Sequence, residues 1–385
     1  MKVVHSCTSD SFSGLEAYVL ELASWQYRSG FDVELFCREG SPLDERARVA
    51  GIPVWTIGAR EKPGLRLWKR VYRGWRERLR LGEAVLHMHA GGEPRYHFPV
   101  LARNPRRLIK TILHYHIWIN HKKTDPWHRA LFLGIDEVWT SSETARAHLS
   151  TLLPIPRTRI RVVPYGRDVG ALTSAPAGEW RRDVRSRLKL AESDVLGLCV
   201  SRLEPIKGVG ELFDAFERAA PKHPSAHLAI IGDASPSNPE AARFAAGLKK
   251  RHAALPESVR ERLHLLGFVS PCEPYMAAAD FYVLPTYEEC MSLAMLDAAI
   301  LGLPILGTNS GGTPSVARPG ETGLLVPPRD SAALAVALEQ LYGAPELCRR
   351  LGAAARQLGR GFDREEIFRR IWEWYGARVP ATIER

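Results

Sequence analysis

The sequence lacks the marks of a membrane-spanning, disulfide-stabilised or repetitive protein. No apolar run reaches the length that crosses a bilayer, no repeat of fixed period occurs, and no low-complexity tract is present. The six cysteines are widely spaced and form no C-x-x-C pair, which indicates reduced thiols. The first residues, Met1 to His5, lack the basic and apolar regions of a signal peptide. We therefore expect a globular protein located in the cytoplasm.

Several ligand-binding signatures are also missing. No helix-turn-helix, zinc finger or RNP-type aromatic motif is visible, so we expect no nucleic-acid partner. No G-x-G-x-x-G follows the first expected strand, which disfavours a dinucleotide-dependent oxidoreductase. The formal charge of +10 nevertheless predicts an anionic partner. The remaining candidates for this anionic partner are a lipid surface and a phosphorylated ligand.

Short apolar runs rich in β-branched residues alternate with helical patterns in both halves of the 385-residue chain. This alternation predicts parallel βαβ units. In the first half we expect strands at 3–4, 33–36, 54–57, 84–87, 108–113, 137–140 and 160–163. In the second half we expect strands at 195–200, 227–231, 264–266, 281–284, 304–307 and 323–326.

The alternation breaks between Gly170 and Arg187, where Pro176 and Gly178 lie among mixed polar residues, and we place the domain junction there. The chain also exceeds the usual size of one hydrophobic core. We expect an α/β protein whose Rossmann-like domains, 1–175 and 190–360, are doubly wound sheets that face each other across a cleft. A last helix within 361–385 is expected to cross back to the first domain.

The segment from Pro285 to Asp330 carries the most specific pattern. It reads PTYEECMSLAMLDAAILGLPILGTNSGGTPSVARPGETGLLVPPRD. Acidic residues follow a strand end, and we expect a helix to begin at 290–293 with free N–H groups that suit a diphosphate. Asp297 would then lie within roughly 80 degrees of Glu289 around that helix. The alternative interpretation is an acidic helix cap with a solvated aspartate.

This segment resembles retaining glycosyltransferase family 4, the glycosyl transferases group 1, which have the GT-B fold. The resemblance rests on Glu289, Asp297, Gly302, Pro304, Gly311, Gly312, Pro314, Gly323, Leu325, Val326, Pro327 and Asp330. It implies that Glu289 contacts the sugar hydroxyls and that Asp297 contacts the ribose of a nucleotide-sugar. The donor-binding turn between them would be Cys290, Met291, Ser292 and Leu293, where the family usually has Gly-Phe-Gly-Leu. Asp297 replaces a Glu of the family, and Ser315 stands where another Glu is expected.

Two further segments resemble loops of the same family. Arg202 and Lys207 follow the strand at 195–200, and the resemblance implies that they bind the donor diphosphate. Two solvated loop cations are the alternative. Gly14 precedes the first helix, where the family has a glycine next to phosphate or acceptor. An ordinary turn explains Gly14 equally well.

Histidines gather where two neighbouring strands are expected to end, His87 and His89 at one and His114 and His116 at the next. The resemblance implies a functional histidine in the second loop. We assign it to His114, in contact with the donor sugar, with His116 as the reserve. The i, i+2 spacing also fits a metal site, but no acidic ligand stands at a standard spacing and no Asp-x-Asp is present. We therefore expect no metal and no cofactor.

The segment from Arg60 to Arg80 contains nine Lys or Arg and two Glu. Apolar residues recur in it at helical spacing and predict one stripe, made of Leu65, Trp68, Tyr72, Trp75 and Leu79. One interpretation is a helix packed on the sheet with a solvated cationic face. The other is contact with an anionic membrane.

Taken with the resemblance, these patterns predict a retaining, metal-independent transferase that uses a nucleotide-sugar donor. Its expected acceptor is a glycan or a lipid-linked molecule of cell-envelope, lipopolysaccharide or glycolipid synthesis, and peripheral contact with the inner face of the plasma membrane is the second expected location. The alternative is a catalytically inactive GT-B domain that acts in binding or assembly.

Overall fold

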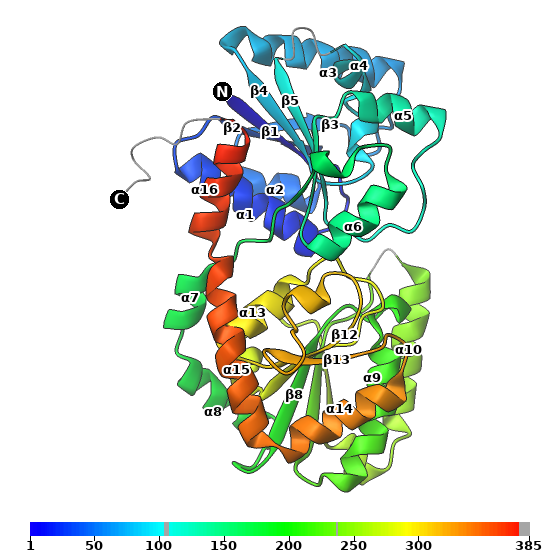
Figure 1. Ribbon diagram of the computed structural model, residues 1–385, viewed down its shortest axis with the longest axis vertical. Coiled ribbons are helices and arrows are strands. Elements are labelled where there is room, and N and C mark those ends of the chain that lie inside the picture. Colours follow the sequence, from blue (N-terminus) through cyan, green and yellow to red (C-terminus); the bar gives the residue numbers. More distant parts are fainter. Residues whose placement is uncertain (104–107, 236–237, 377–385) are drawn as a thin grey trace. The chain divides into compact units, whose positions relative to one another are not determined.

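The computed structural model describes residues 1–103, 108–235 and 238–376. The chain divides into two compact units (Figure 1). The first comprises Met1–Gly166 and the helix α16 at Arg364–Trp374, and the second comprises Arg167–Asp363. The stretch 170–187, expected as an irregular junction, is mostly helical and belongs to the second unit. Pro176 does not break this region because it stands at the N-cap of a helix, where no backbone N–H is needed.

The first unit contains a parallel sheet in the order β3-β2-β1-β4-β5-β6-β7. Its strands are β1 Lys2–Ser6, β2 Val33–Arg38, β3 Val54–Ile57, β4 Ala84–Met88, β5 Ile109–Tyr115, β6 Glu137–Thr140 and β7 Ile160–Val162. Every strand expected in this half is present. The central strands are buried on both faces because helices cover both sides of the sheet, and their side chains are mostly apolar.

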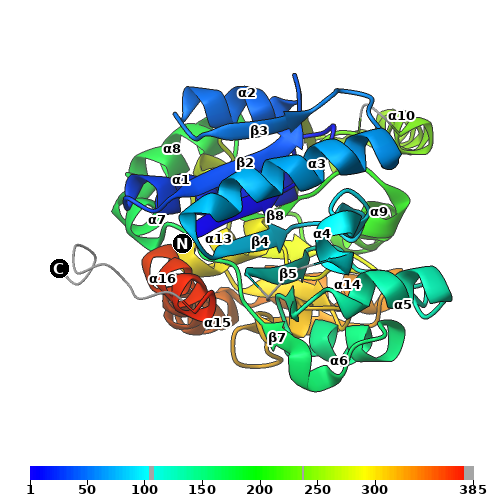
Figure 2. The same ribbon diagram turned by 90° about the horizontal axis from the view of Figure 1, so that it is seen from above.

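Helices of the first unit cover the two faces of that sheet. They are α1 Gly14–Arg28, α2 Pro42–Val49, α3 Leu65–Arg78, α4 Phe98–Ala102, α5 Pro126–Leu133, α6 Glu143–Leu152 and α16. α3, α4 and α5 contact one another in turn (Figure 2). Their buried side chains pack with Val4, Leu86 and Leu113 of the sheet. Alternate strand residues face the other way, toward α1 and α16.

The basic helix α3 buries a stripe that differs from the expected one. Leu67, Val71 and Trp75 are buried against the sheet, whereas Leu65, at the start of the helix, is 73% exposed. The expected stripe was therefore correct in part: Trp75 is buried and Tyr72 and Leu79 pack partly against the same core, but Leu65 does not, and the fully buried residues follow the i, i+4, i+8 spacing. Trp68 is half-buried and donates its indole N–H to the carbonyl of Arg95 at 2.8 Å. Lys and Arg side chains of α3, such as Arg66, Lys69 and Arg73, lie on the exposed face of the helix.

The second unit contains a parallel sheet in the order β10-β9-β8-β11-β12-β13. Its strands are β8 Val195–Val200, β9 Ala226–Ile231, β10 Leu263–Gly267, β11 Phe281–Leu284, β12 Ile305–Thr308 and β13 Gly323–Val326. All strands expected in this half are present. Its helices are α7 Val169–Ser174, α8 Ala177–Arg187, α9 Val209–Ala219, α10 Pro239–Ala253, α11 Glu257–Arg260, α12 Glu273–Ala278, α13 Leu293–Leu301, α14 Ser331–Gly343 and α15 Pro345–Gly359.

The helix α16 completes the first unit although it follows the second in sequence. Its Glu365 accepts a hydrogen bond from the indole N–H of Trp25 in α1 at 2.6 Å, and Arg364 pairs with Glu21 at 3.2 Å. Trp372 stacks on Phe31 with ring centroids 3.7 Å apart. These apolar and charged contacts hold α16 beside α1 (Figure 1).

Candidate functional site

Lys207 and Glu289 form an ion pair at the centre of the second sheet. β8 and β11 are neighbours at the position where the strand order reverses, which is where doubly wound sheets bind ligands. Lys207 follows β8 and Glu289 follows β11, and their Nζ and Oε2 atoms lie 2.7 Å apart. Both side chains are mostly buried, with 16% and 17% of their surface exposed. The structure thus brings together two residues that are 82 positions apart and that the sequence analysis assigned to the same donor.

Close backbone packing fixes the loops that carry this pair. Gly208 has φ +67, and a Cβ there would lie 1.9 Å from the carbonyl oxygen of Pro285. Gly311 has φ +56, and a Cβ there would lie 1.8 Å from the carbonyl oxygen of Glu289. The N–H of Gly312 donates to that same carbonyl at 2.8 Å. Only glycine fits at Gly208 and Gly311, so the loops after β8, β11 and β12 pack tightly against one another.

Arg202 supplies a second cation at the same end of β8. Its guanidinium contacts Glu204 at 2.8 Å and its side chain is 52% exposed. A half-exposed guanidinium keeps donors available for an incoming anion. Arg202 and Lys207 therefore present positive charge beside the strand end, which is the arrangement a diphosphate requires.

The helix α13 follows Glu289 after a short loop. α13 starts at Leu293, and its N-cap Ser292 accepts a hydrogen bond from the N–H of Met295 at 3.3 Å. Leu293 is the last residue of the range 290–293 in which the helix was expected to begin, so Glu289 lies outside the helix and the angle deduced between Glu289 and Asp297 was wrong. Cys290 and Met291 are buried in the loop that precedes the helix. The first N–H groups of α13 still follow the strand end, as phosphate binding requires.

Asp297 is engaged inside the second unit. Its carboxylate oxygens accept hydrogen bonds from Nε and Nη2 of Arg167, at 2.6 and 2.9 Å, and the residue is 4% exposed. Arg167 lies 130 positions away, so no local pattern could have indicated it. The expected contact of Asp297 with a ribose stays a prediction.

In the first unit, Gly14 is exposed at the start of α1. Glu16 reaches back from the first turn and accepts bonds from the N–H and the hydroxyl of Ser13, at 2.7 and 2.8 Å. This reciprocal cap explains why Glu16 stands three residues after Ser13. Contact of the Gly14 backbone with a ligand stays a prediction.

His114 has no exposed surface and lies beside His87, with 3.3 Å between Nδ1 of His114 and Nε2 of His87. Burial, followed by the nearby His116 and His87, lowers the pKa of His114 well below its usual value. The imidazole is therefore neutral at pH 7. Its expected contact with a donor sugar stays a prediction.

Glu93 is a buried acid that the sequence analysis missed. It accepts hydrogen bonds from Ser6 and from the N–H and hydroxyl of Thr8, between 2.5 and 2.9 Å. Burial raises the pKa of Glu93, against the lowering effect of these bonds. The contacts join the loops after β1 and β4, where the order of the first sheet reverses. Its place in Gly91-Gly92-Glu93, directly after a strand, was the signal that could have revealed it.

Comparison with known proteins places the chain in a family. The family model "Glycosyl transferase 4-like domain" matches residues 13–166, and "Glycosyl transferases group 1" matches residues 195–344. The chain belongs to the group 1 glycosyltransferases. Together the two matches span most of both units.

Curated relatives of this group 1 family member are D-inositol 3-phosphate glycosyltransferases. The protein of Nocardia farcinica is 32% identical over 64% of this chain and 55% of its own length. That of Streptomyces griseus is 31% identical over 53% of this chain and 43% of its own length. The chain thus spans about half the length of the curated relatives it matches.

Solved structures show that this group 1 family member has the GT-B fold. Anabaena HepE, crystallised with UDP and glucose, has a TM-score of 0.77 at 18% identity and matches over 98% of this chain and 100% of its own. A glycosyltransferase of Rickettsia africae has a TM-score of 0.84 at 16% identity and matches over 97% of each chain. At these identities the likeness establishes the fold, as the sequence analysis predicted.

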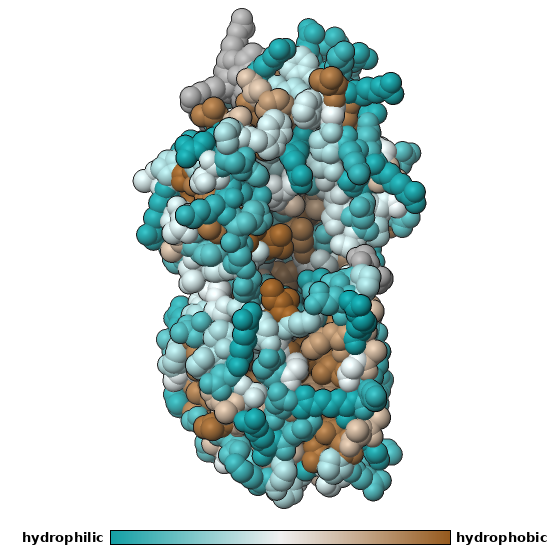
Figure 3. All heavy atoms as spheres, turned by 90° about the vertical axis from the view of Figure 1, so that its right-hand side faces the viewer, coloured by the Kyte–Doolittle hydropathy of each residue, from teal (hydrophilic) through white to brown (hydrophobic). Residues whose placement is uncertain are grey.

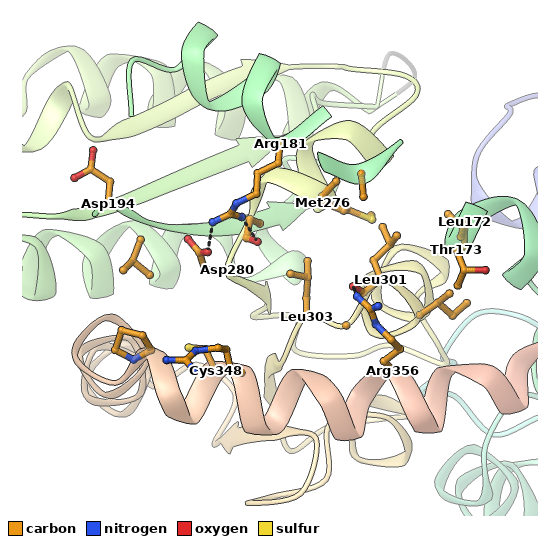
Figure 4. Close-up of a pocket in the computed structure, with 18 of the residues that line it drawn as sticks. Leu172, Thr173, Arg181, Asp194, Met276, Asp280, Leu301, Leu303, Cys348 and Arg356 are labelled. Carbon is orange, nitrogen blue, oxygen red and sulfur yellow. Dashed lines mark hydrogen bonds and ion pairs between the residues drawn. The ribbon is translucent and has the colours of Figure 1, made fainter. Parts of the chain in front are cut away.

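A pocket of about 630 Å³ lies elsewhere in the second unit of this group 1 family member. Val195, Asp280 and Leu303 line it and stand at or just before the starts of β8, β11 and β12. Arg181 points into it and bonds Asp280 at 2.7 Å (Figure 4). Because this pocket lies at the amino ends of the strands, it is separate from the Lys207–Glu289 pair.

Within the described residues, no helix combines the length and the apolar character needed to cross a bilayer. The face drawn in Figure 3 is largely hydrophilic, with hydrophobic residues in separate patches.

Proposed function

We propose that this protein is a glycosyltransferase that moves a sugar from a nucleotide-sugar to an acceptor. The observation that carries the proposal is the Lys207–Glu289 pair, which joins a cation and an acid across β8 and β11 at the strand-order reversal. A nucleotide-sugar offers both an anionic diphosphate and neutral hydroxyls to such a site. Family membership and the UDP bound by the HepE structure support this reading.

The two kinds of group have separate roles in the proposed reaction. Arg202 and Lys207 bind the diphosphate, whose negative charge grows as the bond to the sugar breaks. Glu289 accepts hydrogen bonds from the sugar hydroxyls, and its contact with Lys207 holds the carboxylate beside the strand end until the donor arrives. The first N–H groups of α13, at Leu293, face the same diphosphate. No metal enters this scheme.

We further propose that the sugar keeps its anomeric configuration and that the acceptor belongs to cell-envelope glycan or glycolipid synthesis. The resemblance to retaining family 4 supports the first part. The second is supported by the relatives named for inositol 3-phosphate and by a TM-score of 0.69, at 16% identity, with a lipopolysaccharide galactosyltransferase.

The donor is tested by calorimetry with UDP-, GDP-, ADP- and TDP-sugars, followed by kinetics with the one that binds. Arg202→Ala and Lys207→Ala should each lower transition-state binding by about 2–4 kcal/mol, as for loss of one preorganised electrostatic donor. Lys222→Ala is the matched control, because Lys222 is 63% exposed and pairs with Glu339 on the surface. Unchanged kcat/KM in both folded site variants would refute the diphosphate role.

We also propose that the cationic face of α3 docks on an anionic membrane. Arg66, Lys69 and Arg73 are exposed on it, beside the exposed Leu65. Replacement of the three cations by Glu should abolish sedimentation with phosphatidylserine vesicles and leave the fold intact. The control changes Arg243, Lys249 and Lys250, exposed on α10, in the same way. Equal pelleting of both variants would eliminate α3 as the docking surface.

An inactive binding domain is the second candidate, and the Arg167–Asp297 pair favours it because a carboxylate held by an arginine has less capacity for ribose hydroxyls. Donor hydrolysis or transfer decides between the two. Turnover that disappears with Lys207→Ala supports the enzyme. Tight nucleotide binding without turnover, across the acceptor classes named above, supports the binding domain.

A further inference from the structure

Five buried histidines lie together in the first unit. His5, His87 and His114 come from the neighbouring strands β1, β4 and β5, and His89 and His116 follow two residues after the last two. All five are at most 7% exposed. Side chains two residues apart on a strand point the same way, so the five rings gather on the face toward α1. The ring centroids of His114 and His116 are 3.9 Å apart.

Most of their nitrogens are paired with one another. His5 Nδ1 lies 2.9 Å from His89 Nε2, and His89 Nδ1 lies 3.1 Å from His116 Nε2. His116 Nδ1 lies 2.9 Å from the hydroxyl of Tyr165. Imidazole nitrogen is the commonest metal ligand in proteins.

Some buried polar atoms in and beside the cluster have no hydrogen-bond partner in the described part of the chain. Among the described residues, these are Nε2 of His114 and the hydroxyl of Tyr18, both buried beside His116, while Nε2 of Gln26 next to His5 is a third such atom. The Tyr18 ring lies 6.3 Å from the His114 ring and 5.5 Å from the His116 ring. A buried polar atom without a partner is costly and often indicates an ion or an ordered water.

We propose that His89, His114 and His116 bind one divalent transition-metal ion of the zinc class. One ligand nitrogen from each lies within 4.8 Å of the others. Two ligands of a tetrahedral zinc ion are roughly 3.3 Å apart, given bonds of about 2.0–2.1 Å. Rotation of the rings about their Cβ–Cγ bonds, a soft torsion, closes the remaining distance.

The second nitrogen of each proposed ligand already has a partner. His89 Nε2 faces His5, His114 Nδ1 faces His87, and His116 Nδ1 faces Tyr165. Metal-bound histidines characteristically donate their other N–H to such a group, which fixes the ring. When the ion takes the place of the proton between His89 Nδ1 and His116 Nε2, that proton passes to Nδ1 of His116, where the Tyr165 oxygen accepts it, and His89 keeps its proton on Nε2. Both rings then stay neutral.

A second trio, His5, His87 and His89, also meets the distance criterion. It is the poorer site because His5 and His87 use both of their nitrogens in hydrogen bonds, with Gln26, His89, His114 and Tyr375. In the chosen trio, Nε2 of His114 is still available. The fourth position is left for a water, which the Tyr18 hydroxyl can bond. The ion would tie the ends of β4 and β5 together, and because it would use the remaining nitrogen of His114, it excludes a hydrogen bond from that ring to the donor sugar.

The test uses the full untagged chain, stripped of metal with a chelator and titrated with Zn²⁺. We expect one zinc per chain by elemental analysis, a Tm rise of at least about 5 °C from binding to the folded state alone, and a tetrahedral visible spectrum with Co²⁺. A chain that takes up no zinc and shows no Tm shift would overturn the proposal.

Variants locate the ion. His114→Gln should remove zinc binding, and Tyr165→Phe, which keeps all three ligands, should weaken it about tenfold or more through the lost outer bond. His97→Gln is the matched control, since His97 is buried in the same unit but bonds Ser6 and Trp75 instead. Wild-type zinc affinity in both His114→Gln and Tyr165→Phe would reject the site. Loss of zinc in folded Tyr165→Phe alongside retention in His97→Gln supports it even if His114→Gln does not fold.

Discussion

Because Asp297 forms an ion pair with Arg167, we expect Asp297→Asn to lower the stability of the protein strongly, although the two side chains have nearly the same shape. Asp297→Asn removes the negative charge beside a guanidinium that bonds both carboxylate oxygens, at 2.6 and 2.9 Å. Removing one partner of a buried pair costs about 3–5 kcal/mol. Arg167 is 18% exposed, so water offsets part of this, and we expect a loss of about 2–4 kcal/mol.

Hydrogen exchange followed by mass spectrometry measures the effect where it arises. Peptides from α13, which carries Asp297, should lose protection in the variant, and calorimetry should show a Tm lower by roughly 4–12 °C. Glu257→Gln is the control in the same unit, since Glu257 is 76% exposed and lies 3.7 Å from Arg260. It should change stability by less than about 0.5 kcal/mol. Equal stability of Asp297→Asn and wild type would refute the reasoning.

The same residue separates a folding role from a ligand role. If Asp297 also receives the ribose, wild type should bind 2′-deoxy and 3′-deoxy donors more weakly than the parent by about 1–3 kcal/mol, because these analogues remove the partner hydroxyls and leave the protein unchanged. If it serves only Arg167, the deoxy donors should bind as tightly as the parent while Asp297→Asn still loses stability.

Three further predictions follow from local geometry. Gly311→Ala should lower the free energy of unfolding by about 2 kcal/mol or more and weaken donor binding. Gly320→Ala is the control, also at positive φ but with open space around it, and should lower stability by only about 1 kcal/mol. Equal urea midpoints for the two variants would contradict this. Burial lowers the pKa of His97 to about 3, so the neutral ring contributes its full stabilisation above pH 6.5 and loses it as the pH falls. Between pH 6.5 and 4.5, the free energy of unfolding in urea should therefore fall by about 2–3 kcal/mol less in His97→Gln than in wild type. An equal fall in the two proteins would contradict this. Trp372→Ala should destabilise the first unit by about 3–5 kcal/mol, because it removes the ring that stacks on Phe31. Tryptophan fluorescence follows the unfolding of the first unit, since the second unit contains only Trp180. An unchanged unfolding transition would contradict this packing role.

The parallel strands could be predicted because each is a short apolar run between turns, and both orders follow the doubly wound rule. Lys207 and Glu289 could be brought together for the same reason, since each follows a strand and those strands are neighbours. The Arg167–Asp297 pair could not, because it joins distant segments with no shared pattern. The angle between Glu289 and Asp297 was misjudged because Glu289 lies in a loop before α13, where its carbonyl accepts a hydrogen bond from the N–H of Gly312, which follows β12.

The histidines illustrate the same limit. Their i, i+2 spacing placed His87 with His89 and His114 with His116 on two strands. It gave no indication of His5 or Tyr165, which reach the cluster from other segments of the first unit.

The position of α16 has a consequence for how the chain is made. A ribosome releases residues 1–166 long before residues 364–376, with the whole of Arg167–Asp363 between them. Until the last segment emerges, Phe31 and Trp25 lack their partners on α16, and His87 lacks the hydroxyl of Tyr375, which bonds it at 2.7 Å. The nascent first unit therefore presents an apolar, histidine-lined face, and its folding finishes only after translation of the second has ended.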